Sequence, residues 1–277
     1  MKLSILAALP ENKINVFLEK LTSNFIDSDF ANFNYFPFPV IKLQPIKTAF
    51  EEFGFQEINE FDYLLFTSSY GASIFFDQLK EQAIRLNQKT QLVSVGPSVS
   101  KVIKSNKYKV ALTADIFSAD GLADKLRKTI QFSAKRFLLI TGQKSNSQIL
   151  EQTITQESGA YEKLVLYSSN TVVSPCWENL AAFIDCTQNP NYHSFICLSS
   201  PEGAKAFSEL LNSHEDFVGI QNFEIEFIAQ NIKFICLGPA TKDLVKNLFP
   251  NNEVLIGSEY SYRGIINSIK STIGMNH

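Results

Sequence analysis

The residues best suited to chemistry in this 277-residue chain are small and polar, and they stand where short apolar runs end. Four such turns occur: Thr67-Ser68-Ser69, Gly96-Pro97-Ser98, Ser199-Ser200-Pro201 and Gly238-Pro239-Ala240-Thr241. Each precedes a predicted amphipathic helix, whose first N–H groups have no partner within the helix and carry partial positive charge. Because small side chains let a ligand reach that backbone, these turns are predicted to receive an anion.

The turns belong to an internal repeat. Residues 63–79 match residues 195–211 at a shift of 132, and residues 91–104 match residues 233–246 at a shift of 142. Residues 117–121 match residues 260–264 at a shift of 143. Since the three blocks keep their order, the sequence predicts a duplicated domain, with a ligand in the cleft between its copies.

Short apolar runs alternate with amphipathic stretches along most of the chain. The predicted strands are Leu3–Leu9, Phe38–Leu43, Tyr63–Thr67, Leu92–Val95, Lys109–Leu112, Phe137–Thr141, Lys163–Tyr167, Phe195–Leu198, Phe234–Leu237 and Val254–Ile256. The predicted helices are Lys13–Thr22, Gly71–Leu86, Ser98–Ser105, Ala119–Ile130, Asn146–Glu157, Glu178–Cys186, Ala204–Asn212, Ala240–Leu248 and Tyr262–Ser271. This alternation predicts an α/β protein built of two similar, flavodoxin-like parallel-sheet lobes.

Composition argues against several function classes. The formal net charge of −3 disfavours a nucleic-acid binder, and no apolar run reaches the length that spans a membrane. The three histidines show no metal-ligand spacing, and no phosphate-loop, dinucleotide or serine-hydrolase motif occurs, so we expect no metal and no cofactor. None of the four cysteines forms a C-x-x-C pair, which favours small core residues in the reducing cytoplasm.

The order of the turns resembles that of a known family, the uroporphyrinogen-III synthases. The resemblance is carried by Thr67-Ser68-Ser69, Ser199-Ser200-Pro201 and Gly238-Pro239-Ala240-Thr241, together with the strand Leu164-Val165-Leu166-Tyr167. Each motif is short, and their joint order over nearly the whole chain carries the assignment.

The family resemblance implies how the chain is divided. One lobe is expected to comprise residues 1–38 and 168–277, and the other residues 43–163. Two extended connecting strands are expected near residues 37–43 and 163–169. The segment Pro37-Phe38-Pro39 suits an extended crossing, because each proline fixes φ.

The resemblance also implies an activity, that of a monomeric hydro-lyase of heme biosynthesis. Hydroxymethylbilane, a linear tetrapyrrole with eight carboxylates, would lose water and close to uroporphyrinogen III with ring D inverted, without a cofactor. Tyr167 matches the family's tyrosine at the departing hydroxyl. The implied substrate-binding residues are Thr67, Ser68, Ser69, Gly96, Ser98, Lys144, Ser199, Ser200, Gly238, Ala240 and Thr241.

Other interpretations of the same residues stay open. A non-catalytic two-lobed module that binds a tetrapyrrole or another small anion explains the repeat equally well. A glycosyltransferase is weaker, because no nucleotide-site signature occurs. Tyr167 could simply pack at a strand end, and Ser68 and Thr241 could be plain helix caps. Trp177 is expected in the core.

Overall fold

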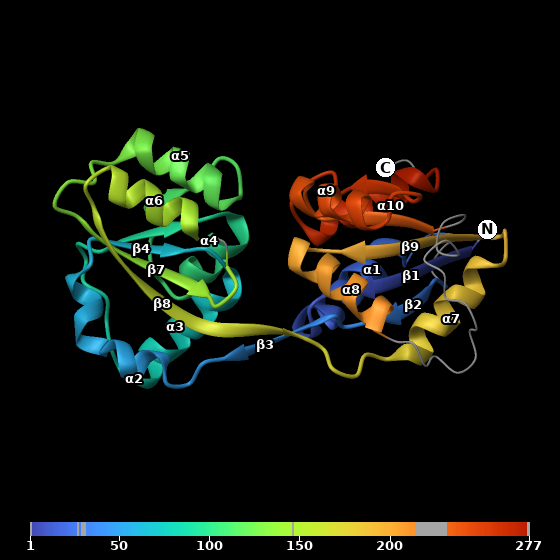
Figure 1. Ribbon diagram of the computed structural model, residues 1–277, viewed down its shortest axis with the longest axis horizontal. Coiled ribbons are helices and arrows are strands. Elements are labelled where there is room, and N and C mark those ends of the chain that lie inside the picture. The colour runs from blue at the N-terminus through green and yellow to red at the C-terminus, as the bar shows by residue number, and fades with distance from the viewer. Residues whose placement is uncertain (1, 27, 29–31, 146, 214–231, 276–277) are drawn as a thin grey trace. The chain divides into compact units, whose positions relative to one another are not determined.

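The computed structural model describes residues 2–26, 28, 32–145, 147–213 and 232–275. The chain divides into two compact units, each drawn with its own sheet and helices in Figure 1. Unit 1 comprises Met1–Leu43 and Asn170–His277, and unit 2 comprises Gln44–Ser169. The chain passes between the units twice, near β3 (Ile41–Pro45) and β8 (Ala160–Thr171), which are neighbouring, hydrogen-bonded strands.

Unit 1 contains a five-stranded sheet in the order β11-β10-β9-β1-β2. All four neighbouring pairs are parallel. Its strands are β1 (Lys2–Ala8), β2 (Asn34–Pro37), β9 (Tyr192–Leu198), β10 (Ile232–Cys236) and β11 (Glu253–Ile256). Its helices are α1 (Ile14–Phe25), α7 (Trp177–Thr187), α8 (Pro201–Ser213), α9 (Pro239–Leu248) and α10 (Tyr262–Thr272), with a 3-10 turn at Glu11–Lys13.

Unit 2 contains a six-stranded sheet in the order β3-β8-β7-β4-β5-β6, whose pairs from β8 to β6 are parallel. Besides β3 and β8, its strands are β4 (Tyr63–Phe66), β5 (Gln91–Ser94), β6 (Leu112–Thr113) and β7 (Arg136–Gly142). Its helices are α2 (Ala49–Phe53), α3 (Ser69–Glu81), α4 (Pro97–Ser105), α5 (Ala119–Thr129) and α6 (Gln148–Gln156), with a 3-10 helix at Phe55–Glu60.

The two sheets share one topology. If β4, β5 and β6 are matched with β9, β10 and β11, then β7 and β8 match β1 and β2, and the order of these five strands is the same in both sheets. The edge strand β3 is additional in unit 2. In unit 1 the last two of these strands come from the start of the chain, whereas unit 2 is continuous. The predicted α/β class and duplicated, parallel-sheet lobes are therefore confirmed.

Both faces of each sheet are covered by helices. Side chains of β1 alternate between two apolar clusters: Leu6 and Ala8 pack in one, and Leu3, Ile5 and Ala7 in the other. Because both faces of this strand are buried, its sequence is a nearly continuous apolar run instead of an alternation of apolar and polar residues. Trp177 packs against the first of these clusters, as predicted.

The segment predicted as one strand over Phe38–Leu43 is wrong in its bounds. Instead β2 ends at Pro37 and β3 begins at Ile41. Pro37 and Pro39 have no N–H to donate, so only the N–H groups of Phe38 and Val40 reach the neighbouring carbonyls of Ala7 and Leu9, at 3.1 and 3.0 Å.

Other element bounds also differ from prediction. The strand predicted over Lys109–Leu112 is reduced to β6, because only Leu112 and Thr113 pair with β5. The helix predicted to end at Leu86 ends at Glu81, since Ala83 adopts a left-handed backbone with φ of 54°. The short helices over residues 49–60 were not predicted. Asn146, the predicted first residue of a helix, lies outside the described residues.

Candidate functional site

The predicted turns lie at the carboxyl ends of parallel strands in both units. We call the turns after β4, β5, β6 and β7, together with Tyr167 on β8, the unit 2 rim. The turns after β9, β10, β11 and β1 form the unit 1 rim. Each turn leads directly into a helix, so each rim gathers several helix N-termini, which favour negative charge.

Serine hydroxyls cap the first and third helices of each rim. Ser68 Oγ accepts a hydrogen bond from the N–H of Gly71 at 3.0 Å, and Ser200 Oγ accepts one from Gly203 at 3.0 Å. The same arrangement starts α5, where Ser118 Oγ accepts from Gly121 at 3.0 Å, and α10, where Ser261 Oγ accepts from Gly264 at 3.1 Å. The repeat is therefore preserved at the level of single hydrogen bonds.

The Gly-Pro turns start the second helix of each rim. Gly96 is the N-cap of α4 and Gly238 that of α9, and in both helices proline follows in the first turn, where its missing N–H costs nothing. Both glycines are covered by an aromatic ring. A Cβ atom on Gly96 would lie 3.2 Å from Phe117, and one on Gly238 would lie 2.5 Å from Tyr260. Glycine is needed here because the ring approaches the backbone so closely.

Tyr167 is held tightly within the unit 2 rim. Its hydroxyl donates a hydrogen bond to Ser68 Oγ at 3.0 Å. Its ring meets Tyr70 edge-on, with centroids 5.1 Å apart. A register shift in the β7–β8 pairing sets Tyr167 opposite Gly142, where an added Cβ atom would lie 2.5 Å from the ring. The position of the phenol thus depends on a glycine on the neighbouring strand.

The hydroxyl of Ser68 has one hydrogen-bonding capacity left. It accepts one bond from the N–H of Gly71 and one from the hydroxyl of Tyr167. A serine oxygen has two lone pairs and one hydrogen. With both lone pairs engaged, the hydrogen of Ser68 is the group that can donate to a ligand, and the bond from Tyr167 makes it a stronger donor.

The remaining predicted residues are spread over separate turns. Ser98, Ala240 and Lys144 are exposed, and Thr67 Oγ1 donates to the carbonyl of Ile140 at 3.2 Å. Ser69 begins α3, and its carbonyl accepts a bond from the Ser73 hydroxyl at 3.0 Å. Among the described predicted residues, the structure brings Ser68 into hydrogen-bond contact with Tyr167.

On the unit 1 rim, two predicted residues are engaged within the protein. Ser199 is hydrogen-bonded to Tyr262, whose pKa burial raises to about 12. Thr241 is only 3% exposed and is not the N-cap of α9, a role that Gly238 takes. The interpretation of Thr241 as a plain cap is therefore wrong.

Sequence reasoning missed four residues of the rims: Tyr70, Gly142, Phe117 and Tyr260. The ring of Tyr70 packs edge-on against that of Tyr167, and burial raises the pKa of the Tyr70 hydroxyl. Phe117 and Tyr260 occupy equal positions in the third repeat block, and this match was the signal that could have identified them. Gly142 gave no sequence signal, because its role depends on the strand register.

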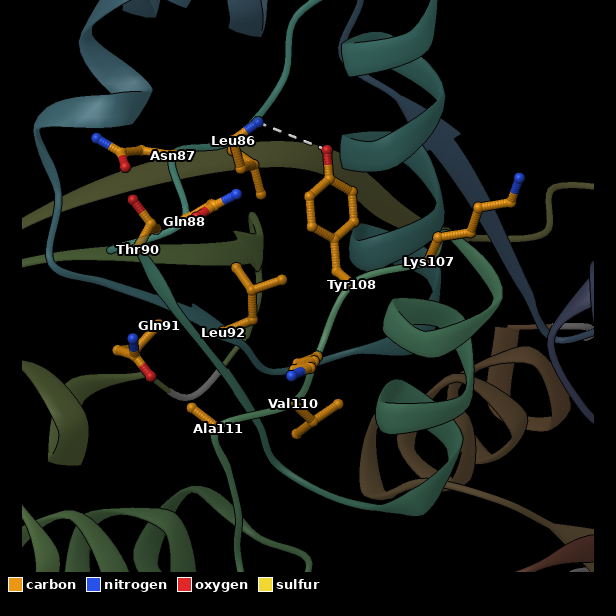
Figure 2. A pocket seen from close by; sticks show the side chains of 11 residues that line it. Leu86, Asn87, Gln88, Thr90, Gln91, Leu92, Lys107, Tyr108, Val110 and Ala111 are labelled. Atoms are coloured by element: carbon orange, nitrogen blue, oxygen red, sulfur yellow. Dashed lines mark hydrogen bonds between the residues drawn. The ribbon is translucent and has the colours of Figure 1, made fainter.

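A cavity of about 680 Å³ lies elsewhere, among residues at the start of β5 and in the segments that precede β5 and β6 (Figure 2). The hydroxyl of Tyr108 accepts a bond from the N–H of Leu86 across it, at 3.5 Å. It is lined by Leu86, Asn87, Gln88, Thr90, Gln91, Leu92, Lys107, Tyr108, Lys109, Val110 and Ala111. No predicted site residue lines it, so it is separate from the rim.

Within the described residues, no three His, Cys, Asp or Glu side chains are grouped so that they could hold a metal ion. Among the helices described, none has the length and apolar character needed to cross a membrane.

The fold and the two rims together define a class of protein. It is a duplicated α/β protein in which the helix N-termini of both units can bind an anion, and in which a tyrosine hydroxyl on the unit 2 rim donates to a capping serine. A family model described as "Uroporphyrinogen-III synthase HemD" matches residues 31–267. Because this match covers most of the chain, the protein belongs to the uroporphyrinogen-III synthase family, which supports a lyase-type enzyme of tetrapyrrole biosynthesis.

Solved structures show the same fold. A mutant uroporphyrinogen III synthase from the extremely thermophilic bacterium Thermus thermophilus is 13% identical and superposes with a TM-score of 0.61, covering 99% of this chain and 100% of the other. Uroporphyrinogen-III synthetase from Helicobacter pylori 26695 is 13% identical with a TM-score of 0.56, covering 98% and 100%. No curated protein matches the sequence.

Proposed function

We propose that the protein is a uroporphyrinogen-III synthase, a hydro-lyase that closes hydroxymethylbilane to uroporphyrinogen III with inversion of ring D. Family membership supports this function over the non-catalytic binding module. The observation that carries the chemistry is the contact between the hydroxyls of Tyr167 and Ser68 at the N-terminus of α3.

The reaction begins with loss of the hydroxyl group from the substrate. As the C–O bond breaks, the departing oxygen takes a proton and leaves as water, and the pyrrole left behind becomes a cationic azafulvene. Ring D then attacks through its substituted carbon, and the spiro intermediate opens and recloses in the inverted sense. A ring proton is released at the end, so one molecule of water is lost overall.

The Ser68–Tyr167 pair is suited to the first step. Ser68 can donate its hydrogen to the departing oxygen while the phenol donates to Ser68. A hydrogen bond placed where charge develops stabilises the transition state more than the substrate. Tyr167 and Ser68 would therefore act together as donors to the leaving group.

The helix N-termini are suited to the substrate's carboxylates. We assign binding through main-chain N–H groups and hydroxyls to Thr67, Ser69, Gly96 and Ser98 in unit 2, with Lys144 as a cation. In unit 1 the same role is assigned to Ser199, Ser200, Gly238, Ala240 and Thr241. Such contacts need no strongly basic chain. Their main contribution is to hold the substrate in the conformer that closes with inversion.

We also propose that the protein works as a monomer in the cytoplasm. All four cysteines are free. Burial raises the pKa of Cys236 to about 12 and that of Cys197 well above its usual range, so both thiols are protonated core groups. Both rims belong to one chain. Sedimentation of the purified protein tests the oligomeric state.

The decisive experiment is incubation of the purified protein with hydroxymethylbilane, followed by chromatographic separation of the type I and type III isomers. We expect the type III isomer in metal-free buffer, at the same rate with and without EDTA. If only type I forms, at the spontaneous rate, the protein is not a synthase. Tight binding of uroporphyrinogen III without turnover would instead support the binding module.

A further inference from the structure

Two aromatic rings lie exposed at equal positions on the two rims. Phe117 is 39% exposed and Tyr260 is 46% exposed. They are two of the six large apolar side chains that are exposed in the described part of the chain. Each immediately precedes the serine that caps the third helix of its rim, Ser118 or Ser261. An exposed ring at this position needs an explanation other than the core.

Each ring lies against the glycine that starts the second helix of its rim. The Cβ and Cγ atoms of Phe117 would lie 3.2 Å from a Cβ atom on Gly96, and Tyr260 Cε1 would lie 2.5 Å from one on Gly238. The ring is therefore flanked by two helix N-termini, that of α4 or α9 through the glycine and that of α5 or α10 through the serine. On each rim an exposed aromatic face therefore lies beside two helix N-termini that can bind an anion.

The units have kept this arrangement while neighbouring positions changed. Ser94 at the end of β5 corresponds to Cys236 at the end of β10, and Ser100 corresponds to Lys242. The ring, the glycine below it and the capping serine remain in both copies. The ring and its two helix N-termini are therefore the same in both copies although neighbouring residues differ. This indicates that the arrangement binds the same kind of group on both rims.

The arrangement fits a particular ligand group. A pyrrole of the linear tetrapyrrole has a flat, electron-rich face and two carboxylate side chains. We infer that Phe117 and Tyr260 each bind the face of one pyrrole, while the two flanking helix N-termini take that ring's carboxylates. Ring stacking is tolerant of which pyrrole is bound, and an aromatic face also stabilises a nearby cation such as the azafulvene. This inference rests on the proposed function and names the substrate contacts of the same rims.

The test uses three substitutions at each position. Phe117→Ala and Tyr260→Ala remove the ring, Phe117→Leu and Tyr260→Leu keep an apolar cover over the glycine, and Phe117→Tyr and Tyr260→Phe exchange the residues of the two copies. We expect the alanine and leucine variants to raise KM for hydroxymethylbilane roughly 3- to 10-fold each, with kcat within about two-fold. The exchange variants should stay within about two-fold of wild type.

Two controls make the result specific. Ile26→Ala removes an exposed apolar side chain, 64% exposed, just after α1 and away from the rim, and it should leave KM unchanged. Melting temperatures of all variants are also compared. If the ring only shields the glycine from solvent, leucine should restore both the melting temperature and KM. Leucine variants with wild-type KM, or alanine variants with wild-type KM, overturn the inference.

Failure of the inference and failure of the proposed function give different results. Equilibrium binding of uroporphyrinogen III under nitrogen is measured for the same variants. If the wild type makes no type III isomer, the proposed function fails, whereas weaker product binding by the alanine variants still supports the ring contacts. If the wild type makes type III and binding is unchanged in every variant, the ring contacts are wrong and the proposed function stands.

Discussion

The two rims share their backbone arrangement but differ in the side chain that lies beside the first helix cap. Ser68 and Ser200 accept the N–H of Gly71 and Gly203 at the same distance of 3.0 Å. Beside Gly71 stands the ring of Tyr167, 3.3 Å from an added Cβ atom, whereas beside Gly203 stands Val40, at 3.7 Å. Among the described residues, a tyrosine hydroxyl therefore contacts the serine that caps the first helix on the unit 2 rim, and Val40 takes the corresponding place on the unit 1 rim.

The difference extends to the end of the second strand. In unit 2 the hydroxyls of Ser94, Ser100 and Thr113 form a mutual hydrogen-bonded group, with separations of 2.6, 3.1 and 3.0 Å. In unit 1 the corresponding strand ends at Cys236, whose thiol is a buried, protonated group. Helix N–H groups that can bind carboxylates thus occur on both rims, whereas this group of three hydroxyls belongs to the unit 2 rim.

This asymmetry suits a substrate with one reacting end. Carboxylates occur along the whole tetrapyrrole, so both rims can bind them, but the departing hydroxyl occurs once. Changes near Tyr167 should therefore reduce the rate more than changes in unit 1.

The largest effect is expected from Gly142→Ala. The added Cβ atom would lie 2.5 Å from the Tyr167 ring, so the ring or the strand must move. Displacement of a catalytic group by about 1 Å costs on the order of 10²-fold in rate. We expect a loss of that size in the initial rate of type III formation. In Gly203→Ala the nearest atom is Ser200 Oγ, at 3.2 Å, and the loss should be at least ten-fold smaller. Equal losses would contradict the comparison.

Tyr167→Phe removes one hydroxyl and leaves the ring in place. A general acid typically contributes ~10²–10⁴-fold, and because Ser68 stays as a donor we expect the low end or less, roughly 10-fold. Initial rates and the type III to type I ratio are measured at equal amounts of folded protein. The melting temperature should change little, since the half-buried phenol donates to a serine that also has solvent nearby. An unchanged rate and ratio would remove Tyr167 from the mechanism.

Ser68→Ala and Ser200→Ala compare the two caps directly. Each loses one helix cap, so the free energy of unfolding should fall by about 1 kcal/mol in both. Ser68→Ala also removes the partner of Tyr167, so its rate should fall several-fold more than that of Ser200→Ala. Urea unfolding and initial rates are measured on the same samples. If Ser200→Ala proves the more damaging to the rate, the assignment of chemistry to unit 2 is wrong.

The smallest effect is expected in how the stability of each unit depends on pH. Partial burial acts to raise the pKa of Asp62, but hydrogen bonds from Lys135 and from the Arg136 N–H outweigh it, so the pKa lies below its usual 3.8. Glu151 is likewise lowered, because Lys163 and Ser147 outweigh its burial. Carboxyls with lowered pKa stabilise the fold above their unfolded pKa, and this contribution is lost as pH falls through the folded value. Unit 2 should therefore loosen in acid.

Unit 1 should instead lose stability at high pH. Burial raises the pKa of Tyr262 from 10.0 to about 12, and that of Tyr35 as well. The stabilisation is complete below pH 10 and is lost as pH rises toward 12. Hydrogen exchange read by peptide should show faster exchange in unit 2 at low pH and in unit 1 at high pH. The opposite order would show that other groups control each unit.

Much of the fold could be predicted because its signals are local. The predicted helices and most strands follow from apolar periodicity, and the caps at Ser68, Ser118, Ser200 and Ser261 involve residues three apart. The repeat was visible because both copies must place N–H groups at strand ends. The missed short helices and the displaced bounds of β2 and β3 lie where prolines and a crossing between units interrupt that periodicity.

The sequence by itself determined the class of fold, the repeat and the turns able to receive an anion, since each depends on residues within one helix or strand and the turn beside it. Only the tertiary structure decided which hydroxyls meet. Tyr167 and Ser68 are 99 residues apart, and they touch because β8 and β4 both flank β7, with a register shift at Gly142. Strand order and register are set by the packing of the whole sheet, so no local pattern specifies that contact.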